Sequence, residues 1–74
     1  MLKTSTIIIL EKIAIENLDN CDSWDISTIL WGFSKFDGYD SDELFKLAEP
    51  KVIDLMPEFS NSEFINVFRA FTDN

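Results

Sequence analysis

The chain has 74 residues, of which 46% are hydrophobic and seven are Phe, and its formal net charge at pH 7 is -8. This length allows one domain at most, and this hydrophobic content favours a packed core over disorder. The absence of His excludes a histidine base, a histidine metal ligand and any Ser-His-Asp triad, and the single Cys excludes an internal disulfide. The acidic charge argues against bulk binding of nucleic acid, which needs a local basic surface.

The first predicted element is a helix over about residues 5–18. Its apolar stripe comprises Ile7, Leu10, Ala14 and Leu18. The β-branched run at residues 6–9 would also suit a strand. The same run is too short for a signal peptide core or a membrane span and meets Glu11 and Lys12 at once. We therefore expect neither a secretory signal nor a membrane segment here.

Three further helices are predicted over about residues 22–36, 41–56 and 60–73, each from apolar residues at helical spacing. The stripes are Ile26, Ile29, Leu30 and Phe33 in the first; Leu44, Phe45, Ala48, Val52, Leu55 and Met56 in the second; and Phe64, Val67, Phe68 and Phe71 in the third. Pro50 falls on the outward side of the second. Because proline removes a helical hydrogen bond, we expect a bend or break near residues 47–49.

Each of these three helices is preceded by a capping signal. The predicted capping boxes pair Asp22 with Asp25, Asp40 with Glu43, and Ser60 with Glu63, and Phe59 and Phe64 occupy the positions of a hydrophobic staple around the last box. Gly38 is expected to stop the helix over 22–36. The sequence therefore marks the beginnings of the helices more clearly than their ends.

The acids at residues 37–43 raise the alternative of a calcium loop. Such a loop needs a glycine at its sixth position and a carboxylate at its twelfth. Counted from Asp37, these positions hold Asp42 and Ala48, so the pattern fails twice. We interpret the acids as helix caps and expect no metal site.

Two of the capping signals are 38 residues apart, and this offset superposes the apolar stripes in register. The aligned pairs include Glu11 and Glu49, Ile26 and Phe64, Ile29 and Val67, Leu30 and Phe68, Gly32 and Ala70, and Phe33 and Phe71. A helix-pair period of this size is typical of an α-solenoid. We predict an all-α solenoid segment with the second helix of one repeat (5–18), a complete repeat (22–56) and the first helix of a third (60–73).

The segments "ILWGFSKF" and "PEFSNSEFINVFRAF" resemble the octatricopeptide repeats and the similar repeats of RAP-domain and FAST-kinase-like proteins. The first helix of such a repeat reads approximately Phe-Ser-x-x-Glu-Leu-x-Asn-x-x-Trp-Ala-Phe-Ala-Lys-Leu. Residues that match this pattern are Phe59, Ser60, Glu63, Phe64, Asn66, Ala70 and Phe71 in the last helix, and Trp31, Phe33, Lys35 and Phe36 in the earlier one. Three positions depart from it: Gly32 replaces Ala, Arg69 replaces Trp, and Thr28 replaces Asn.

The resemblance implies a role in mitochondria or another organelle, where such repeats bind single-stranded RNA or form part of ribosomes and RNA-processing assemblies. Binding would use base stacking and backbone contacts, with about one nucleotide per repeat. The RAP domain, the candidate catalytic part of that family, has no counterpart here. We expect no enzyme activity, no cofactor and no small-molecule substrate, and we see no organellar targeting segment.

A possible RNA-reading strip follows from helical spacing. Trp24, Thr28, Trp31 and Lys35 share the side opposite Ile26 and Phe33, and the repeat offset carries this stripe to Ser62, Asn66, Arg69 and Asp73. The candidate RNA contacts are Thr28, Trp31, Lys35, Asn66 and Arg69, with Trp31 expected beside Arg69. A structural role is the alternative for each: packing for Trp31, a solvated or capping role for Asn66 and Arg69, and a helix-dipole contact for Lys35.

A second function remains open. Because a solenoid needs caps, the first and last helices are expected to expose apolar faces that neighbouring protein subunits cover. The acidic charge favours this alternative, in which the chain is a protein-protein interaction scaffold without direct RNA contact.

Overall fold

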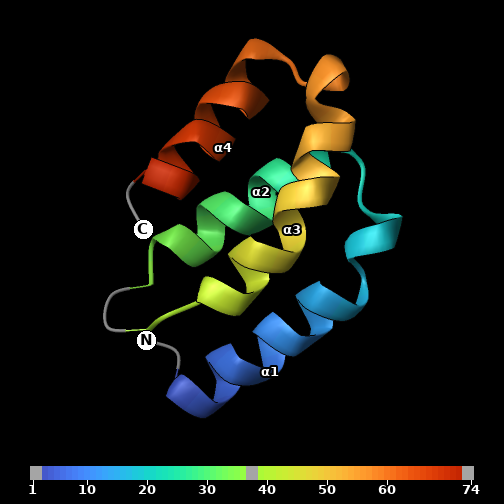
Figure 1. Cartoon of the computed structure of the whole chain (residues 1–74). Helices are drawn as coiled ribbons and strands as arrows, with labels where there is room; N and C mark the ends of the chain where they lie inside the picture. Colours follow the sequence, from blue (N-terminus) through green and yellow to red (C-terminus); the bar gives the residue numbers. More distant parts are fainter. Residues whose placement is uncertain (1–2, 37–38, 73–74) are drawn as a thin grey trace.

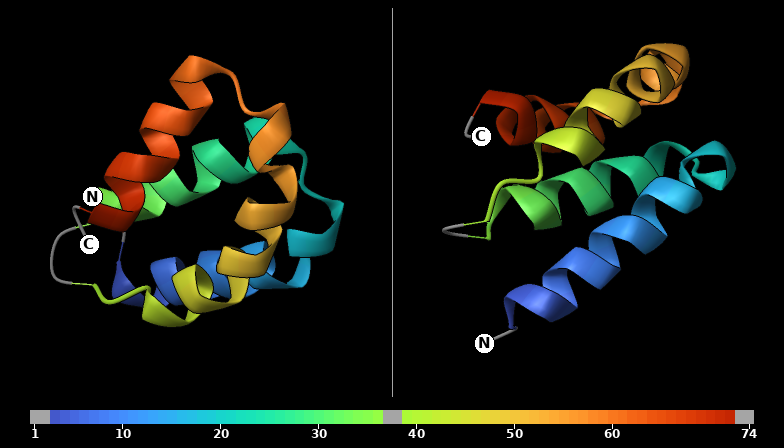
Figure 2. Two further views of the ribbon diagram at one scale, coloured as in Figure 1. Left: turned by 45° about the horizontal axis from the view of Figure 1, so that its top comes forward. Right: turned by 60° about the horizontal axis from the view of Figure 1, so that its bottom comes forward.

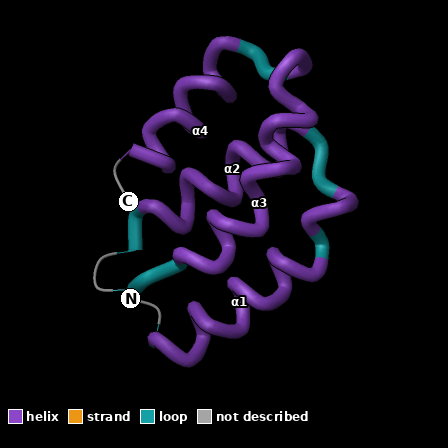
Figure 3. The backbone as a smooth tube through the Cα atoms, in the orientation of Figure 1, coloured by secondary structure: helices purple, strands orange, loops and turns teal. Residues whose placement is uncertain are grey.

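The computed structural model describes residues 3–36 and 39–72, and within these ranges the chain is helical throughout, with no strand (Figure 1). The elements in chain order are α1 (Thr4–Glu16), the 3-10 turn η1 (Leu18–Asn20), α2 (Ser23–Ser34), α3 (Asp42–Leu55), the 3-10 turn η2 (Met56–Glu58) and α4 (Asn61–Thr72). The described connections between them are short (Figure 3). The all-α prediction is confirmed, and no described helix combines the length and the apolar character needed to cross a bilayer.

Consecutive helices run in opposite directions, so that α1 and α3 point one way and α2 and α4 the other (Figures 1 and 2). The closest backbone packing joins α2 to α4, and α3 packs against both α1 and α2. Of the pairs that are neighbours in sequence, α2 and α3 pack together, whereas α1 and α2, like α3 and α4, make few backbone contacts. The packing of α2 on α4 and of α1 on α3 therefore joins helices that are distant in sequence.

One hydrophobic core joins all four helices. Its buried members are Ile7, Ala14, Leu18, Cys21, Ile26, Leu30, Phe33, Leu44, Phe45, Ala48, Val52, Val67 and Ala70. The predicted stripe of the first helix needs one correction, because Leu10 is exposed and Glu11 is buried in its place. The side chain of Tyr39 makes this possible, since its hydroxyl donates a hydrogen bond to Glu11 Oε1.

Two of the three predicted capping boxes are confirmed. In α2, Asp22 Oδ1 accepts from Asp25 N at 2.8 Å and Asp25 Oδ2 accepts from Asp22 N at 3.3 Å. At the start of α4, Ser60 Oγ accepts from Glu63 N at 3.2 Å and Glu63 Oε1 accepts from Ser60 N at 2.9 Å.

The predicted box at α3 is wrong. Ser41 takes the N-cap position without a side-chain cap bond, and Asp40 Oδ1 accepts instead from Asp42 N at 3.0 Å. This shorter-range bond to the residue two positions on fits a turn instead of a capping box. Gly38, the predicted stop of the preceding helix, lies outside the described residues.

Pro50 does not break its helix, because α3 continues through it from Asp42 to Leu55. The proline ring is exposed, as predicted, while Ala48 and Val52 on either side of it are buried. Packing on the buried face holds both halves of α3 in one helix and offsets the hydrogen bond that proline cannot donate. The predicted break near residues 47–49 is therefore wrong.

Candidate interaction surfaces

The proposed RNA contacts lie on α2 and α4, and one of them, Thr28, lines a groove between α1 and α2 that is described below. Thr28, Trp31, Lys35 and Arg69 are exposed, and Asn66 is half-buried. α2 and α4 run side by side in the same direction (Figure 2). Asp73, which the repeat offset adds to this strip, lies outside the described residues.

Within the strip, the structure brings Trp31 and Lys35 together. Lys35 Nζ lies 5.3 Å from the centroid of the Trp31 ring, within cation–π range. The indole is 41% exposed, so it is not the buried packing residue that the structural alternative assumed. Among the described residues, no side-chain hydrogen bond links α2 to α4 across the strip.

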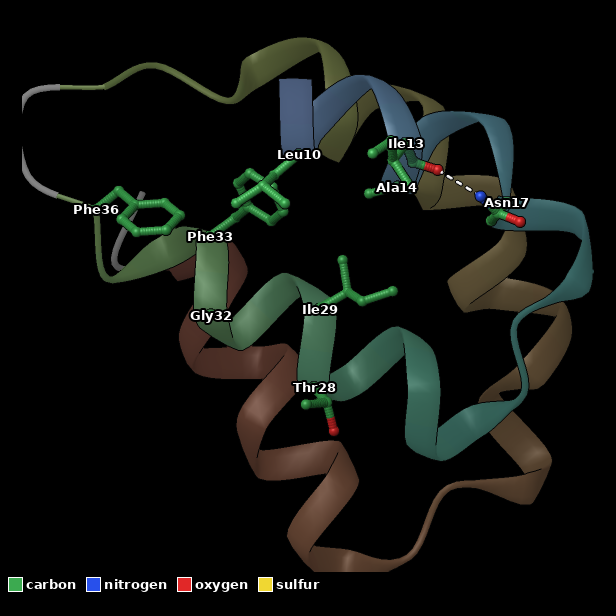
Figure 4. Close-up of a pocket in the computed structure, with 9 residues that line it drawn as sticks. All are labelled: Leu10, Ile13, Ala14, Asn17, Thr28, Ile29, Gly32, Phe33 and Phe36. Carbon is green, nitrogen blue, oxygen red and sulfur yellow. Dashed lines mark hydrogen bonds between the residues drawn. The ribbon is translucent and has the colours of Figure 1, made fainter. Parts of the chain in front are cut away.

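A larger feature is an apolar groove between α1 and α2, which we call the α1/α2 groove. Its volume is about 470 Å³, and none of the described residues that line it is ionisable. The lining residues are Leu10, Ile13, Ala14, Asn17, Thr28, Ile29, Gly32, Phe33 and Phe36. Figure 4 shows the apolar side chains of both helices facing the space between them, with Asn17 at one end donating to the Ile13 carbonyl at 2.8 Å.

A second apolar groove, the α3/α4 groove, has a volume of about 380 Å³. It is lined by Glu49, Val52, Ile53, Met56, Phe59, Phe64, Val67, Phe68 and Phe71. Its exposed aromatic rings include Phe64 and Phe68, which stack on each other with centroids 6.3 Å apart. Among its described lining residues, Glu49 alone is ionisable.

The 38-residue offset relates these grooves to the core between the helix pairs. The α1/α2 groove residues Ile29 and Gly32 correspond to Val67 and Ala70, which are buried. The α3/α4 groove residues Phe64 and Phe68 correspond to Ile26 and Leu30, which are also buried. At these positions the groove residues have buried counterparts in the other helix pair, and Val67 both belongs to the buried core and lines the α3/α4 groove.

The buried residues Glu11 and Cys21 take part in side-chain hydrogen bonds. The hydrogen bond from Tyr39 to Glu11 raises the pKa of the tyrosine hydroxyl to about 12, because ionisation would remove the donor and place two negative charges together. Burial raises the pKa of the Cys21 thiol, and that thiol donates to the Asn17 carbonyl at 3.3 Å. A raised pKa leaves Cys21 protonated and poorly nucleophilic.

Sequence reasoning expected exposed apolar faces on the first and last helices, but it did not locate the two grooves or name their lining residues. A signal for them was present: the apolar residues of each helix pair exceed what one buried face needs. Ile13, Ile53 and Met56, for example, are exposed residues that now line a groove. In the described part of the chain, no three His, Cys, Asp or Glu side chains gather as a metal-ligand set would.

Comparisons with protein-family models, with curated protein sequences and with solved structures gave no match for this chain.

Proposed function

We propose that this chain is a non-catalytic helical-repeat segment that acts as a protein-protein interaction scaffold, binding apolar helical surfaces in its two grooves. The observation that carries the proposal is the pair of grooves themselves, which lie between α1 and α2 and between α3 and α4. The solenoid interpretation is part of it: two helix pairs related by a 38-residue offset, with each exposed groove matching a face that is buried in the other pair.

The lining of the grooves favours protein over RNA as the occupant. RNA binding draws on Lys and Arg that neutralise phosphates. In the part of the chain that the structure describes, no ionisable residue lines the α1/α2 groove, and the acidic Glu49 alone does so in the α3/α4 groove. Apolar patches rimmed by polar residues are typical of protein interaction sites. The chain's net charge of -8 points the same way.

Site-specific photo-crosslinking in cells tests this proposal. A benzoylphenylalanine residue would replace Ile13 in one groove or Phe68 in the other, and Ile9, exposed outside both grooves, provides the matched control. We expect crosslinks to protein at the two groove positions and none at the control position. Equal crosslinking at all three positions, or none at any, would contradict the proposal.

RNA binding in an organelle is the second candidate function, and the exposed Trp31 with its neighbouring Lys35 favours it. An indole can stack on a base, and the lysine charge can contact a phosphate. The family resemblance supports the same function, and Arg69 would supply a second planar group on α4. Against it, the lysine ammonium already occupies one face of the indole ring.

Tryptophan fluorescence tests this candidate directly. In a Trp24→Phe variant, Trp31 is the remaining Trp, since the chain has two. Stacking on single-stranded oligouridine should quench this emission, and Arg69→Glu should weaken the effect. Quenching that persists near about 150 mM salt supports RNA binding, and unchanged emission at low salt counts against it.

A further inference from the structure

We propose that the partner bound at the two grooves is a second copy of this chain. The surface around the α1/α2 groove of one copy packs against the surface around the α3/α4 groove of the next copy, which gives a head-to-tail stack. This inference rests on the proposed scaffold function and names its partner. It is drawn from the chain's own internal packing, in which one helix pair already seats on the other in this manner.

The junction inside the chain provides the template. There, Ile26 and Leu30 of the first pair and Val67 and Ala70 of the second belong to one buried cluster, and α2 packs closely along α4. The 38-residue offset aligns Ile26 and Leu30 with Phe64 and Phe68, which are exposed in the α3/α4 groove. The same offset aligns Val67 and Ala70 with Ile29 and Gly32, which line the α1/α2 groove. The two open faces are thus the same two faces that are joined at the junction.

Side-chain size follows the same division. At the junction the buried α4 residues Val67 and Ala70 are smaller than the buried α2 residues Ile26 and Leu30. At the aligned positions of the open faces, Gly32 in the α1/α2 groove is likewise smaller than Phe64 and Phe68 in the other, and Phe33 and Phe36 supply larger side chains beside Gly32. A Cβ placed on Gly32 would meet no atom within 4 Å, so this part of the groove has room for a large side chain. Large residues facing small ones are the basis of close helix packing.

The geometry of such a contact is heterologous, because the two surfaces that meet are different. Contacts of this kind leave a free face at each end and generate open stacks unless the rotation closes a ring. The net charge of -8 on each copy opposes association, and salt screens this repulsion. Stacking should therefore strengthen as salt is raised, whereas RNA binding would weaken.

Sedimentation velocity of the purified chain tests the stack, over about 1 µM to 1 mM protein, a range that covers weak and moderate affinities. Ile13→Glu blocks the α1/α2 groove, Phe68→Glu blocks the α3/α4 groove, and Ile9→Glu is the control outside both. All three residues are exposed, and circular dichroism checks that each variant stays helical. We expect the wild type and the control to form larger species as concentration rises, and each groove variant alone to remain monomeric.

A mixture of the two groove variants tests whether the two grooves bind each other. Ile13→Glu keeps an intact α3/α4 groove and Phe68→Glu keeps an intact α1/α2 groove, so an equimolar mixture should form a dimer and nothing larger. A mixture that stays monomeric, or a groove variant that still associates alone, would overturn the head-to-tail arrangement. A wild type that is monomeric at about 1 mM in high salt would overturn self-stacking altogether.

The two proposals fail in different ways. If the purified wild type stays monomeric while Ile13 and Phe68 still crosslink to another protein in cells, the scaffold function stands and the second copy is not its partner. If neither position crosslinks to any protein in cells, the scaffold function fails. Self-association of the purified chain would then not reflect an interaction that occurs in cells.

Discussion

The apolar stripes of α2 and α4 superpose at an offset of 38 residues, but several of the aligned residues differ in burial. Leu30 in α2 is 0% exposed, whereas Phe68, at the equivalent place in α4, is 58% exposed. In the other direction, Ala70 in α4 is fully buried while Gly32 in α2 lines an open groove. The difference teaches that burial here depends on which neighbour a helix pair has, and much less on the residue itself.

Glu11 and Glu49, which the 38-residue offset aligns, also differ in burial. Glu11 is buried and accepts a hydrogen bond from Tyr39, while Glu49 is exposed at the edge of the α3/α4 groove. The loop that supplies Tyr39 follows α2, so it covers α1 and reaches no equivalent position on α3. A buried carboxylate needs such a partner, because desolvation of an unpaired charge is costly.

The largest expected effect separates the two equivalent core positions. Leu30→Ala should destabilise the fold by about 2–5 kcal/mol, because it leaves a cavity in a packed core. Phe68→Ala should change the free energy of unfolding of the monomer by less than about 0.5 kcal/mol, because its ring is largely in solvent. Urea denaturation at low protein concentration measures both. Similar losses at the two positions would show that the contrast between the pairs is absent in solution.

The next effect concerns the polar contact that only the first pair has. Because the pKa of Tyr39 is raised from 10.0 to about 12, the folded chain keeps its tyrosine protonated where the unfolded chain ionises. The resulting stability is fully present below about pH 10 and is lost as the pH rises through about 12. Tyrosinate absorbance reports the pKa directly, since the chain has one Tyr.

Tyr39→Phe is the control for that pH dependence. It should lower stability at neutral pH, because Glu11 is left buried without its donor, and it should remove the tyrosine contribution above about pH 10. Lysines titrate in the same range, so the difference between the two proteins is the quantity to compare. An identical stability profile for both would contradict the role given to this contact.

A smaller and symmetrical effect is expected at the helix caps. Asp22→Ala and Ser60→Ala each remove one side of a capping box at equivalent ends of α2 and α4. Each should cost about 1 kcal/mol in the free energy of unfolding, as N-cap losses typically do. Chemical denaturation provides the measurement. A loss confined to one of the two variants would mean that the two helices are not equivalent elements of a repeat.

The smallest effect should be a gain. Gly32→Ala should stabilise the fold by about 0.5–1 kcal/mol, because alanine loses less backbone freedom in a helix and the new Cβ meets no neighbour. The reverse change at the equivalent place, Ala70→Gly, should destabilise, because it also removes a buried methyl group. Thermal unfolding of both variants gives the comparison. A loss of stability in Gly32→Ala would indicate that the groove is closed in solution.

Much of the local structure was predictable because it depends on neighbouring residues in the sequence. Helical spacing located α1 to α4 within a few residues, and two capping boxes formed as their sequences indicate, since both partners lie within one turn. The outward position of Trp31 was predictable for the same reason. What failed locally was the effect of Pro50 and of Asp40, where more than one outcome fits the same short sequence.

The sequence by itself determined the helices, two of their N-terminal caps and which residues are apolar enough to favour burial. Only the tertiary structure decided which of those residues are covered. Glu11 is buried because Tyr39 reaches it, and Leu30 is buried because a second helix pair packs on the first. Phe68, which the 38-residue offset aligns with Leu30, is exposed because no described helix packs over it. Burial is a property of a neighbour's position in space, which helical periodicity does not specify.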